Sequence, residues 1–378
     1  MLDCFVQPFR PRESDKPATT EALERLNEFI ESWFLFSLIW SVGATCDNDG
    51  RRKFSEWLRK KFEHETIKLP IPNEGLVYDY VLDDGGIFSS GEEGKSEEEE
   101  DASKKRQIRW RHWLQGLPPY QIAPDAKYSD ILVPTIDNVR NAYVTEMLLR
   151  MDKPVLCVGP TGTSKTLTVV DKLMRSMPKE FSPEFIVFSA KTNVNQTQDL
   201  IDSKLDKRRR GIFGPPLGKV FIFFIDDLNM PALETYGSQP PIELIRQYMD
   251  FKGWYDRKVV GEFRNLVDIN FICAMGPPGG GRNPVSPRLT RHFNFLSFTE
   301  LENDSMLKIF STIFDWWTKA SDISQANSEK LILTSIQVYK TVCTQLLPTP
   351  NKSHYTFNLR DLSKVFQGML MVEAKKID

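Results

Sequence analysis

The segment at residues 159–166, with the sequence GPTGTSKT, restricts the folds open to this chain more than any other. It follows an apolar run at 154–158 with the composition of a strand, and apolar residues recur with helical spacing at 167–174. A loop of this kind between a strand and a helix binds phosphate through its backbone N–H groups. The predicted phosphate-binding residues are Gly159, Pro160, Thr161, Gly162, Thr163, Ser164, Lys165 and Thr166.

Three positions in this loop have distinct expected roles. Lys165 is expected to reach the β and γ phosphates of a nucleotide, and the Thr166 hydroxyl to bind Mg²⁺. Ser164 stands where the pattern has a glycine. If the backbone there has positive φ, serine costs about 1 kcal/mol or more of strain, which would weaken phosphate binding. The alternative is a turn before a helix with no ligand.

A second segment, from Lys219 to Ile225, is apolar and aromatic-rich and is followed by Asp226 and Asp227. Carboxylates at the end of a buried parallel strand suit Mg²⁺. We expect Asp226 to hold the metal ion and Asp227 to orient or deprotonate an attacking water. Many ATPases of this type carry glutamate at the second position, and the aspartate carboxylate is withdrawn by about 1.5 Å. Displacements of about 1 Å lower rates on the order of 10²-fold, so hydrolysis is in doubt; alternatively, both acids only cap the strand.

The charge of the 378-residue chain gives no reason to expect a nucleic-acid or membrane partner. Lysine and arginine number 49, and aspartate and glutamate number 51. The basic run at 207–210 has no aromatic stacking platform beside it, so we do not expect it to bind nucleic acid. The most apolar window, 33–42, is about half the ~20 residues that span a bilayer, so a buried helix is expected there.

The cysteines and the N-terminus indicate a cytosolic environment. The five cysteines are odd in number and widely spaced, and Cys157 and Cys273 fall in expected strands, so all are expected to be free thiols. The four histidines have no zinc-ligand spacing with them. The first residues lack the pattern of a secretory signal, which makes the cytosol the expected compartment.

Apolar runs alternate with helical patterns from Trp113 to about Phe298, which predicts a parallel sheet with helices on both faces. The expected strands are 155–158, 185–188, 220–225, 267–275 and 293–298. Three helices are expected beyond them, at 304–317, 329–347 and 359–375. Asn358 is expected to cap the last helix, with Asp361 at its third position.

The N-terminal part is expected to be helical and to lack a sheet of its own. A helix at 20–40 would bury one face, formed by Leu23, Leu26, Phe29, Ile30, Trp33 and Phe34. After a turn at 47–50, a second helix would cover 51–62. The expected division of the chain is a helical tail of a preceding domain at 1–90, an acidic disordered loop or partner-binding tract at 91–109, an α/β subdomain at 110–300 and a helical subdomain at 301–378.

Several long segments together resemble AAA+ ATPases, and among them the third ring module of axonemal dynein heavy chains. Beside the phosphate loop, they are NQTQ (195–198), IDSKLDKR (201–208), GIFGPPLGK (211–219), DDLNMP (226–231), QPPIEL (239–244) and MGPPGGGRNP (275–284). Residues 40–47 and the helices around them resemble the end of the preceding module, the second. The resemblance implies an AAA+ P-loop NTPase of α/β class: a five-stranded parallel sheet flanked by helices, with an N-terminal helical segment and a C-terminal helical subdomain.

The resemblance also implies roles for residues outside the two motifs. Ile131 and Val133 would pack on adenine, although by themselves they are also consistent with a short edge strand. Arg360 would approach the γ-phosphate and, with Asp227, serve catalysis. Arg288 and Arg291 would act as arginine fingers on the nucleotide of the neighbouring module. Without the resemblance, Arg360 is also consistent with a solvated helix residue, and Arg288 and Arg291 with ordinary surface charge.

At Gly276, where the family has a water-positioning asparagine, this chain has no side chain. The site would bind ATP or ADP with Mg²⁺, and its departures from the family all concern phosphate contact or catalysis. The implied parent is a minus-end-directed microtubule motor of cilia or flagella, located in the cytoplasm, the cytoskeleton and the axoneme. Its partners would be the other AAA+ modules of the heavy chain, dynein intermediate and light chains, and microtubules. Two other interpretations remain: a competent stand-alone ATPase, and a structural module that holds ADP permanently.

Overall fold

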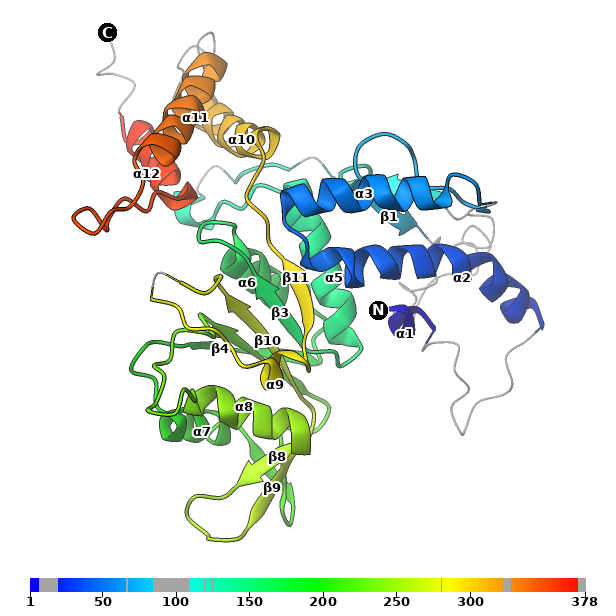
Figure 1. The fold of residues 1–378 in the computed structure, drawn as a ribbon, viewed down its shortest axis with the longest axis vertical. Helices are drawn as coiled ribbons and strands as arrows, with labels where there is room; N and C mark the ends of the chain where they lie inside the picture. Colours follow the sequence, from blue (N-terminus) through cyan, green and yellow to red (C-terminus); the bar gives the residue numbers. More distant parts are fainter. Residues whose placement is uncertain are drawn as a thin grey trace.

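A five-stranded parallel sheet forms the centre of the molecule. The computed structural model describes residues 1–6, 20–65, 67–83, 109–118, 120–123, 126–279, 281–321 and 328–372. The sheet consists of β3 (Val155–Val158), β4 (Phe181–Val187), β7 (Val220–Asp226), β10 (Ile269–Met275) and β11 (Asn294–Ser297). Their order is β11-β3-β10-β7-β4, and every neighbouring pair is parallel (Figure 1). The predicted α/β fold is confirmed.

Helices cover both faces of this sheet, because alternate residues of its strands point to opposite sides. On one face, Cys157 and Phe224 pack with apolar residues of α5 (Ile136–Arg150) and α6 (Lys165–Arg175). On the other, Leu156 and Phe223 pack with α7 (Val194–Asp202) and α8 (Pro240–Phe251). All seven residues of β10 are buried, as expected for a central strand of a doubly covered sheet.

Two strands begin two or more residues away from their predicted starts. The prediction of 185–188 was wrong at its start, because β4 begins at Phe181 and includes Pro183. Proline is tolerated there because β4 lies at the edge of the sheet and pairs only with β7. The prediction of 267–275 began too early, because Asp268 has a φ of 54° and turns the chain before β10.

The N-terminal segment packs directly on the sheet layer. It includes α1 (Leu2–Val6), α2 (Thr20–Ser41) and α3 (Asn48–Phe62) (Figure 1). The predicted buried face of α2 was wrong in part: Ile30 and Phe34 are exposed, whereas Trp33, Phe36 and Trp40 are buried. These three belong to one apolar cluster that also contains Val144 and Leu296 from α5 and β11, together with Trp113 and further residues of the N-terminal segment. The segment and the sheet therefore share one core.

Three predictions for the N-terminal part need correction. The predicted turn at 47–50 is the start of α3, because the Asp47 side chain accepts a hydrogen bond from Gly50 N and caps the helix. A sheet exists here after all, since β1 (Tyr80–Asp83) pairs antiparallel with β2 (Arg109–His112). Arg109 thus belongs to a strand, and the rest of the predicted acidic loop, 91–108, lies outside the described residues.

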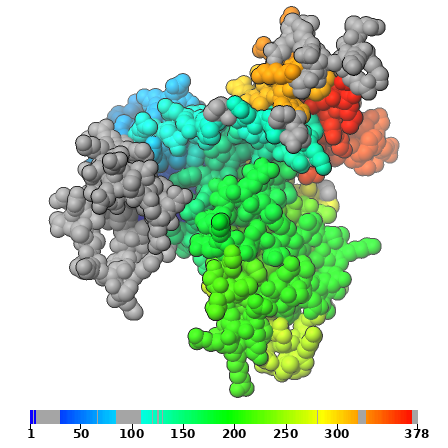
Figure 2. All heavy atoms as spheres, turned by 180° about the vertical axis from the view of Figure 1, so that it is seen from behind, coloured from blue at the N-terminus to red at the C-terminus, as the bar shows by residue number. Residues whose placement is uncertain are grey.

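A second sheet, which the sequence did not indicate, projects from the α7–α8 side. It contains β5 (Asp206–Arg209), β6 (Ile212–Gly214), β8 (Gly253–Tyr255) and β9 (Phe263–Leu266) in the order β5-β6-β9-β8. Figures 1 and 2 show it at the end of the molecule opposite to the C-terminal helices. The basic run 207–210 lies in and beside β5, where the Arg208 side chain donates to Pro215 O at 2.9 Å.

The C-terminal helices form a separate small bundle with its own apolar cluster. They are α10 (Asn303–Ser321), α11 (Ser328–Gln345) and α12 (Leu359–Leu370). Phe310 stacks on Phe366 with ring centroids 4.1 Å apart. The predicted cap of α12 is confirmed: Asn358 accepts from Arg360 N, and Asp361 accepts from Asn358 N.

Other expectations have direct outcomes in the described residues. All five cysteines are free. Within the described part of the chain, no helix is both long enough and apolar enough to cross a membrane.

A buried arginine joins the N-terminal segment to the sheet. Arg51 of α3 is 1% exposed, and its Nη2 donates to Ser297 O on β11 at 2.7 Å. Its guanidinium carbon lies 5.2 Å from the Tyr78 ring centroid, in a cation–π contact. Burial lowers the pKa of Arg51 to about 10, so the side chain stays charged at neutral pH. Next to it, Asn48 Nδ2 donates to Glu300 O at 2.9 Å.

We predict that Arg51→Ala lowers the free energy of unfolding by about 2–4 kcal/mol, because it removes packing and leaves the Ser297 carbonyl without its donor. Urea denaturation followed by circular dichroism measures the change. The matched control is Arg52→Ala, at the exposed neighbouring position, which should change stability by less than about 0.5 kcal/mol. Equal effects of the two variants would contradict a joining role for Arg51.

Candidate nucleotide-binding site

The phosphate loop lies between β3 and α6 and is backed on two sides. A Cβ atom at Gly159 would lie 2.1 Å from Phe298 O, so no larger residue fits there. Gly162 has a φ of 88°, and a Cβ atom on it would lie 3.0 Å from Leu359 N at the start of α12. The loop is therefore in contact with both β11's end and the C-terminal helices.

Ser164 has a left-handed backbone, with φ of 60° and ψ of 17°. The position that the pattern gives to glycine thus does have positive φ in this chain. Serine carries about 1 kcal/mol of strain in this region, and its side chain makes no capping hydrogen bond to α6.

Lys165 is folded back onto the loop that precedes it. Its Nζ donates to Gly159 O at 2.8 Å and to Pro160 O at 2.6 Å, and lies 3.3 Å from Thr163 Oγ1. Burial and, next, the charge of Arg282 lower the pKa of Lys165 to about 8. Burial disfavours the charged form of this ammonium group, and a phosphate anion bound next to it would stabilise that form.

Thr166 and Asp226 meet at the end of the central strands. The Thr166 hydroxyl donates to Asp226 Oδ2 at 2.8 Å. A hydroxyl and a carboxylate in contact form the hard oxygen pair that Mg²⁺ prefers, so these residues fit the metal ion. Bound Mg²⁺ supplies charge neutralisation to phosphate oxygens. Asp227 follows with a φ of 53°, and its N–H donates to Asp226 Oδ1 at 3.0 Å.

Sequence reasoning missed two side chains beside the phosphate loop. Asn229 is fully buried, and its Nδ2 donates to Gly276 O at 2.8 Å, which fixes the strand end that lacks a side chain. Arg282 reaches Thr161, with 3.1 Å between Nη2 and Oγ1. The glycine-rich segment that contains Arg282 was a signal for close backbone approach, but it did not reveal the contact.

The residues expected near adenine lie on an extended segment rather than in a strand. Val133 is buried and Ile131 half-buried, directly after the 3₁₀ turn η4 (Tyr128–Asp130). The Tyr128 hydroxyl donates to Ser363 O at 2.8 Å and so links this segment to α12. Arg360, on the first turn of α12, is exposed, and among the described residues no partner of its guanidinium is found.

Comparison with known proteins gives three family matches along the chain. Residues 1–89 match the dynein heavy chain AAA lid domain, 120–301 the P-loop containing dynein motor region, and 331–378 the AAA+ lid domain. Dynein axonemal heavy chain 1 from Homo sapiens is 56% identical over the whole chain. The chain belongs to the axonemal dynein heavy chain family. It contains an AAA+ P-loop module of that motor.

Other axonemal dynein relatives are more distant. Dynein axonemal heavy chain 12 from Rattus norvegicus is 42% identical over 92% of this chain, and heavy chain 3 from Mus musculus 39% identical over 91%. The chain spans 9% of the length of the human heavy chain 1 and 11% and 8% of the other two relatives.

In this dynein module, the two arginines expected to act as fingers lie away from the phosphate loop. Arg288 lies within the short helix α9 (Pro287–Thr290) and Arg291 is its C-cap, before the amino end of β11, whereas the loop follows the carboxyl end of β3. Because these strands are parallel, the arginines lie at the amino ends of the strands and the phosphate loop at their carboxyl ends, on opposite sides of the sheet. Arg288 is exposed, and Arg291 Nη2 donates to Asp250 Oδ1 at 2.6 Å.

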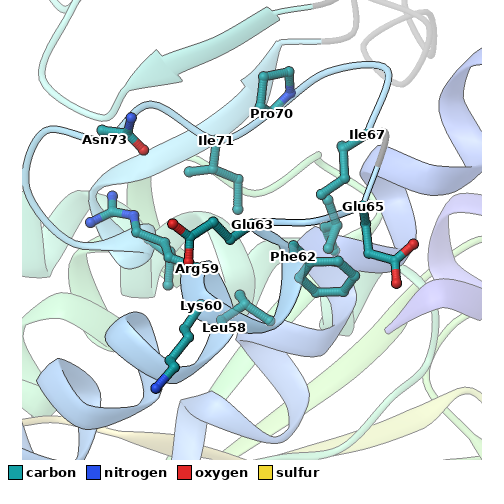
Figure 3. A pocket seen from close by; sticks show the side chains of 12 residues that line it. Leu58, Arg59, Lys60, Phe62, Glu63, Glu65, Ile67, Pro70, Ile71 and Asn73 are labelled. Atoms are coloured by element: carbon teal, nitrogen blue, oxygen red, sulfur yellow. The ribbon is translucent and has the colours of Figure 1, made fainter.

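A separate cavity of about 730 Å³ lies in the lid region, between α2, α3 and the segment after α3 (Figure 3). Arg59 and Glu63 of its lining come from α3 and its end, and Ile67 and Ile71 from the following segment. None of its lining residues belongs to the phosphate loop or to the carboxyl ends of the central strands. The cavity is therefore independent of the candidate nucleotide site.

The pKa of Lys165 predicts how nucleotide affinity depends on pH. Below about pH 8 the amine is charged in the free chain; above it, the amine must take up a proton when phosphate binds. The Kd for MgATP should therefore rise about tenfold per pH unit between about pH 8 and 9.5. Isothermal titration at several pH values measures it.

The matched control is Lys165→Arg, which stays charged and should show a nearly flat Kd over the same range. A flat Kd for the wild-type chain would contradict the lowered pKa.

Proposed function

We propose that this chain binds ATP or ADP with Mg²⁺ at residues 159–166, as the third module of a dynein ring. The observation that carries the proposal is the contact between Thr166 and Asp226, next to the half-buried Lys165, whose amine is folded back onto the phosphate loop. Ile131 and Val133 would contact the base, and Arg360 the terminal phosphate. Thr166 and Asp226 would hold the metal ion.

We further propose that this module regulates the ring more than it turns over ATP. Asp227 carries a short carboxylate where a longer one is common, Gly276 has no side chain to position water, and Ser164 strains the loop. A module with these features would bind nucleotide and hydrolyse it slowly. Permanent retention of ADP is the limiting case, and the nucleotide exchange rate separates it from a regulatory switch.

At the level of the whole protein, the proposed function is ATP-driven, minus-end-directed movement along microtubules in the axoneme of cilia or flagella. The other AAA+ modules of the heavy chain, intermediate and light chains, and microtubules would be its partners. Arg288 and Arg291 would act on the nucleotide of the preceding module, since they lie at the sheet edge opposite to their own phosphate loop. Such a finger supplies on the order of 10³ to 10⁵ in rate.

Lys165→Ala should weaken MgATP and MgADP binding by about 10²-fold or more, because it removes the charge at the phosphates. Isothermal titration of the 378-residue chain tests this. In the matched variant with Arg288→Ala and Arg291→Ala, Kd should change by less than about threefold.

Equal binding by wild type and Lys165→Ala would refute the assignment of the phosphate loop. If the double variant lost binding as severely while circular dichroism showed it folded, the two arginines would act on their own site and the finger assignment would be wrong.

Asp227→Glu should raise the single-turnover rate of ATP hydrolysis by about tenfold or more, because the longer side chain carries the carboxylate about 1.5 Å closer to the water. Asp304→Glu, the same change on the exposed start of α10, is the control and should leave the rate unchanged. A wild-type turnover near about 10 s⁻¹, or a lower rate in Asp227→Glu, would contradict the short-carboxylate explanation.

A further inference from the structure

A second cation lies against the phosphate loop. Arg282 belongs to the segment after β10, and its Nη2 donates to Thr161 Oγ1 at 3.1 Å. Because β10 and β3 are parallel neighbours, this segment leaves the sheet at the same edge as the loop. The guanidinium is thus held at the phosphate loop of its own module.

The place that Arg282 occupies exists because residue 276 is glycine. A Cβ atom on Gly276 would lie 2.7 Å from Arg282 Nε and 2.8 Å from Cδ, closer than such contacts occur. The aliphatic part of the Arg282 side chain therefore fills the space, at the end of β10, that a side chain at residue 276 would occupy. Any side chain at Gly276 would displace Arg282.

The backbone around Arg282 is fixed on both sides. Arg282 and Gly279 exchange two backbone hydrogen bonds, of 3.0 and 3.1 Å. Asn283 N donates to Asn229 O at 3.0 Å, and Asn283 Nδ2 to Pro231 O at 2.9 Å. These hydrogen bonds hold the segment against the residues that follow Asp227. Arg282 therefore has a fixed position relative to the phosphate loop and to the carboxylates at the end of β7.

The guanidinium has unused hydrogen-bonding capacity. Its Nε is buried without a partner, and Thr161 is the one side chain among the described residues to which it donates. A guanidinium presents five donors, and its strongest hydrogen bonding is bidentate, with two parallel hydrogen bonds to one carboxylate or phosphate. The charge of Arg282 also lowers the pKa of Lys165, so two cations lie near each other. Within the described chain, no carboxylate pairs with Arg282. That arrangement fits a polyanion.

We propose that Arg282 contacts the terminal phosphate of a bound nucleoside triphosphate within its own module, and so makes the site prefer triphosphate to diphosphate. This inference rests on the nucleotide site proposed above. Arg282 would contact the third phosphate from the side of β10. Lys165 and the loop backbone would hold the phosphates that ATP and ADP share.

The test compares MgATP and MgADP affinities of the 378-residue chain by isothermal titration. Arg282→Ala should weaken MgATP binding by about tenfold or more and MgADP binding by less than about threefold. Gly276→Ala keeps the arginine but displaces it, and should shift the ATP-to-ADP ratio in the same direction. Arg257→Ala removes an arginine that pairs with Asp199 in the second-sheet region, and should change neither affinity. Arg282→Gln, which keeps a polar side chain but removes the charge, replaces Arg282→Ala if thermal unfolding shows that variant to be unfolded.

Equal weakening of ATP and ADP by Arg282→Ala would overturn the proposal, because the arginine would then only brace the loop through Thr161. Unchanged affinities for both nucleotides would overturn it as well. Failure of the wild-type chain to bind either nucleotide would instead refute the nucleotide site itself, which distinguishes the two failures.

Discussion

The parallel register of β3, β7 and β10 is the constraint on which the candidate site depends. Val158 pairs with Met275, and Ile225 with Cys273, so the three strands end at one edge of the sheet. The phosphate loop, the Asp226 carboxylate and the segment with Arg282 all emerge there. Because side chains alternate between faces, a slip of β7 by one residue would separate Asp226 from Thr166. Burial of every residue of β10 secures the register from the inside.

The sequence was sufficient to predict the parts of the structure that follow from local pattern. The phosphate loop, four strands of the central sheet at nearly their observed bounds, and the Asn358 cap each have a signal within a few consecutive residues. Positive φ at Ser164 was considered only as a condition, because the pattern has glycine at that position, and the structure shows that the condition holds. These features depend on periodicity and turn chemistry, which do not require knowledge of distant neighbours.

Features set by distant contacts escaped prediction for the same reason. β5 consists of four charged residues and becomes a strand only because β6 pairs with it. The start of β4 was missed because Pro183 is tolerated only on an edge strand, and edge position is a property of the whole sheet. Arg282 is separated from Thr161 by more than a hundred residues, and the glycine-rich segment around it indicates close backbone approach but not this contact.

The division of the apolar core bears on which parts of the chain move together. One cluster runs without interruption from Trp33 in the lid region to Leu296 on β11, across the boundary between the two dynein segments matched at 1–89 and 120–301. The cluster around Phe310 contains residues of the C-terminal helices and of the segment that joins β11 to α10. Polar contacts, such as the hydrogen bond from Tyr128 to Ser363, connect these helices to the rest of the chain. The lid and motor region are therefore expected to move as one unit. A shift of the C-terminal helices relative to them is expected to occur inside the module, at the connection from β11 to α10.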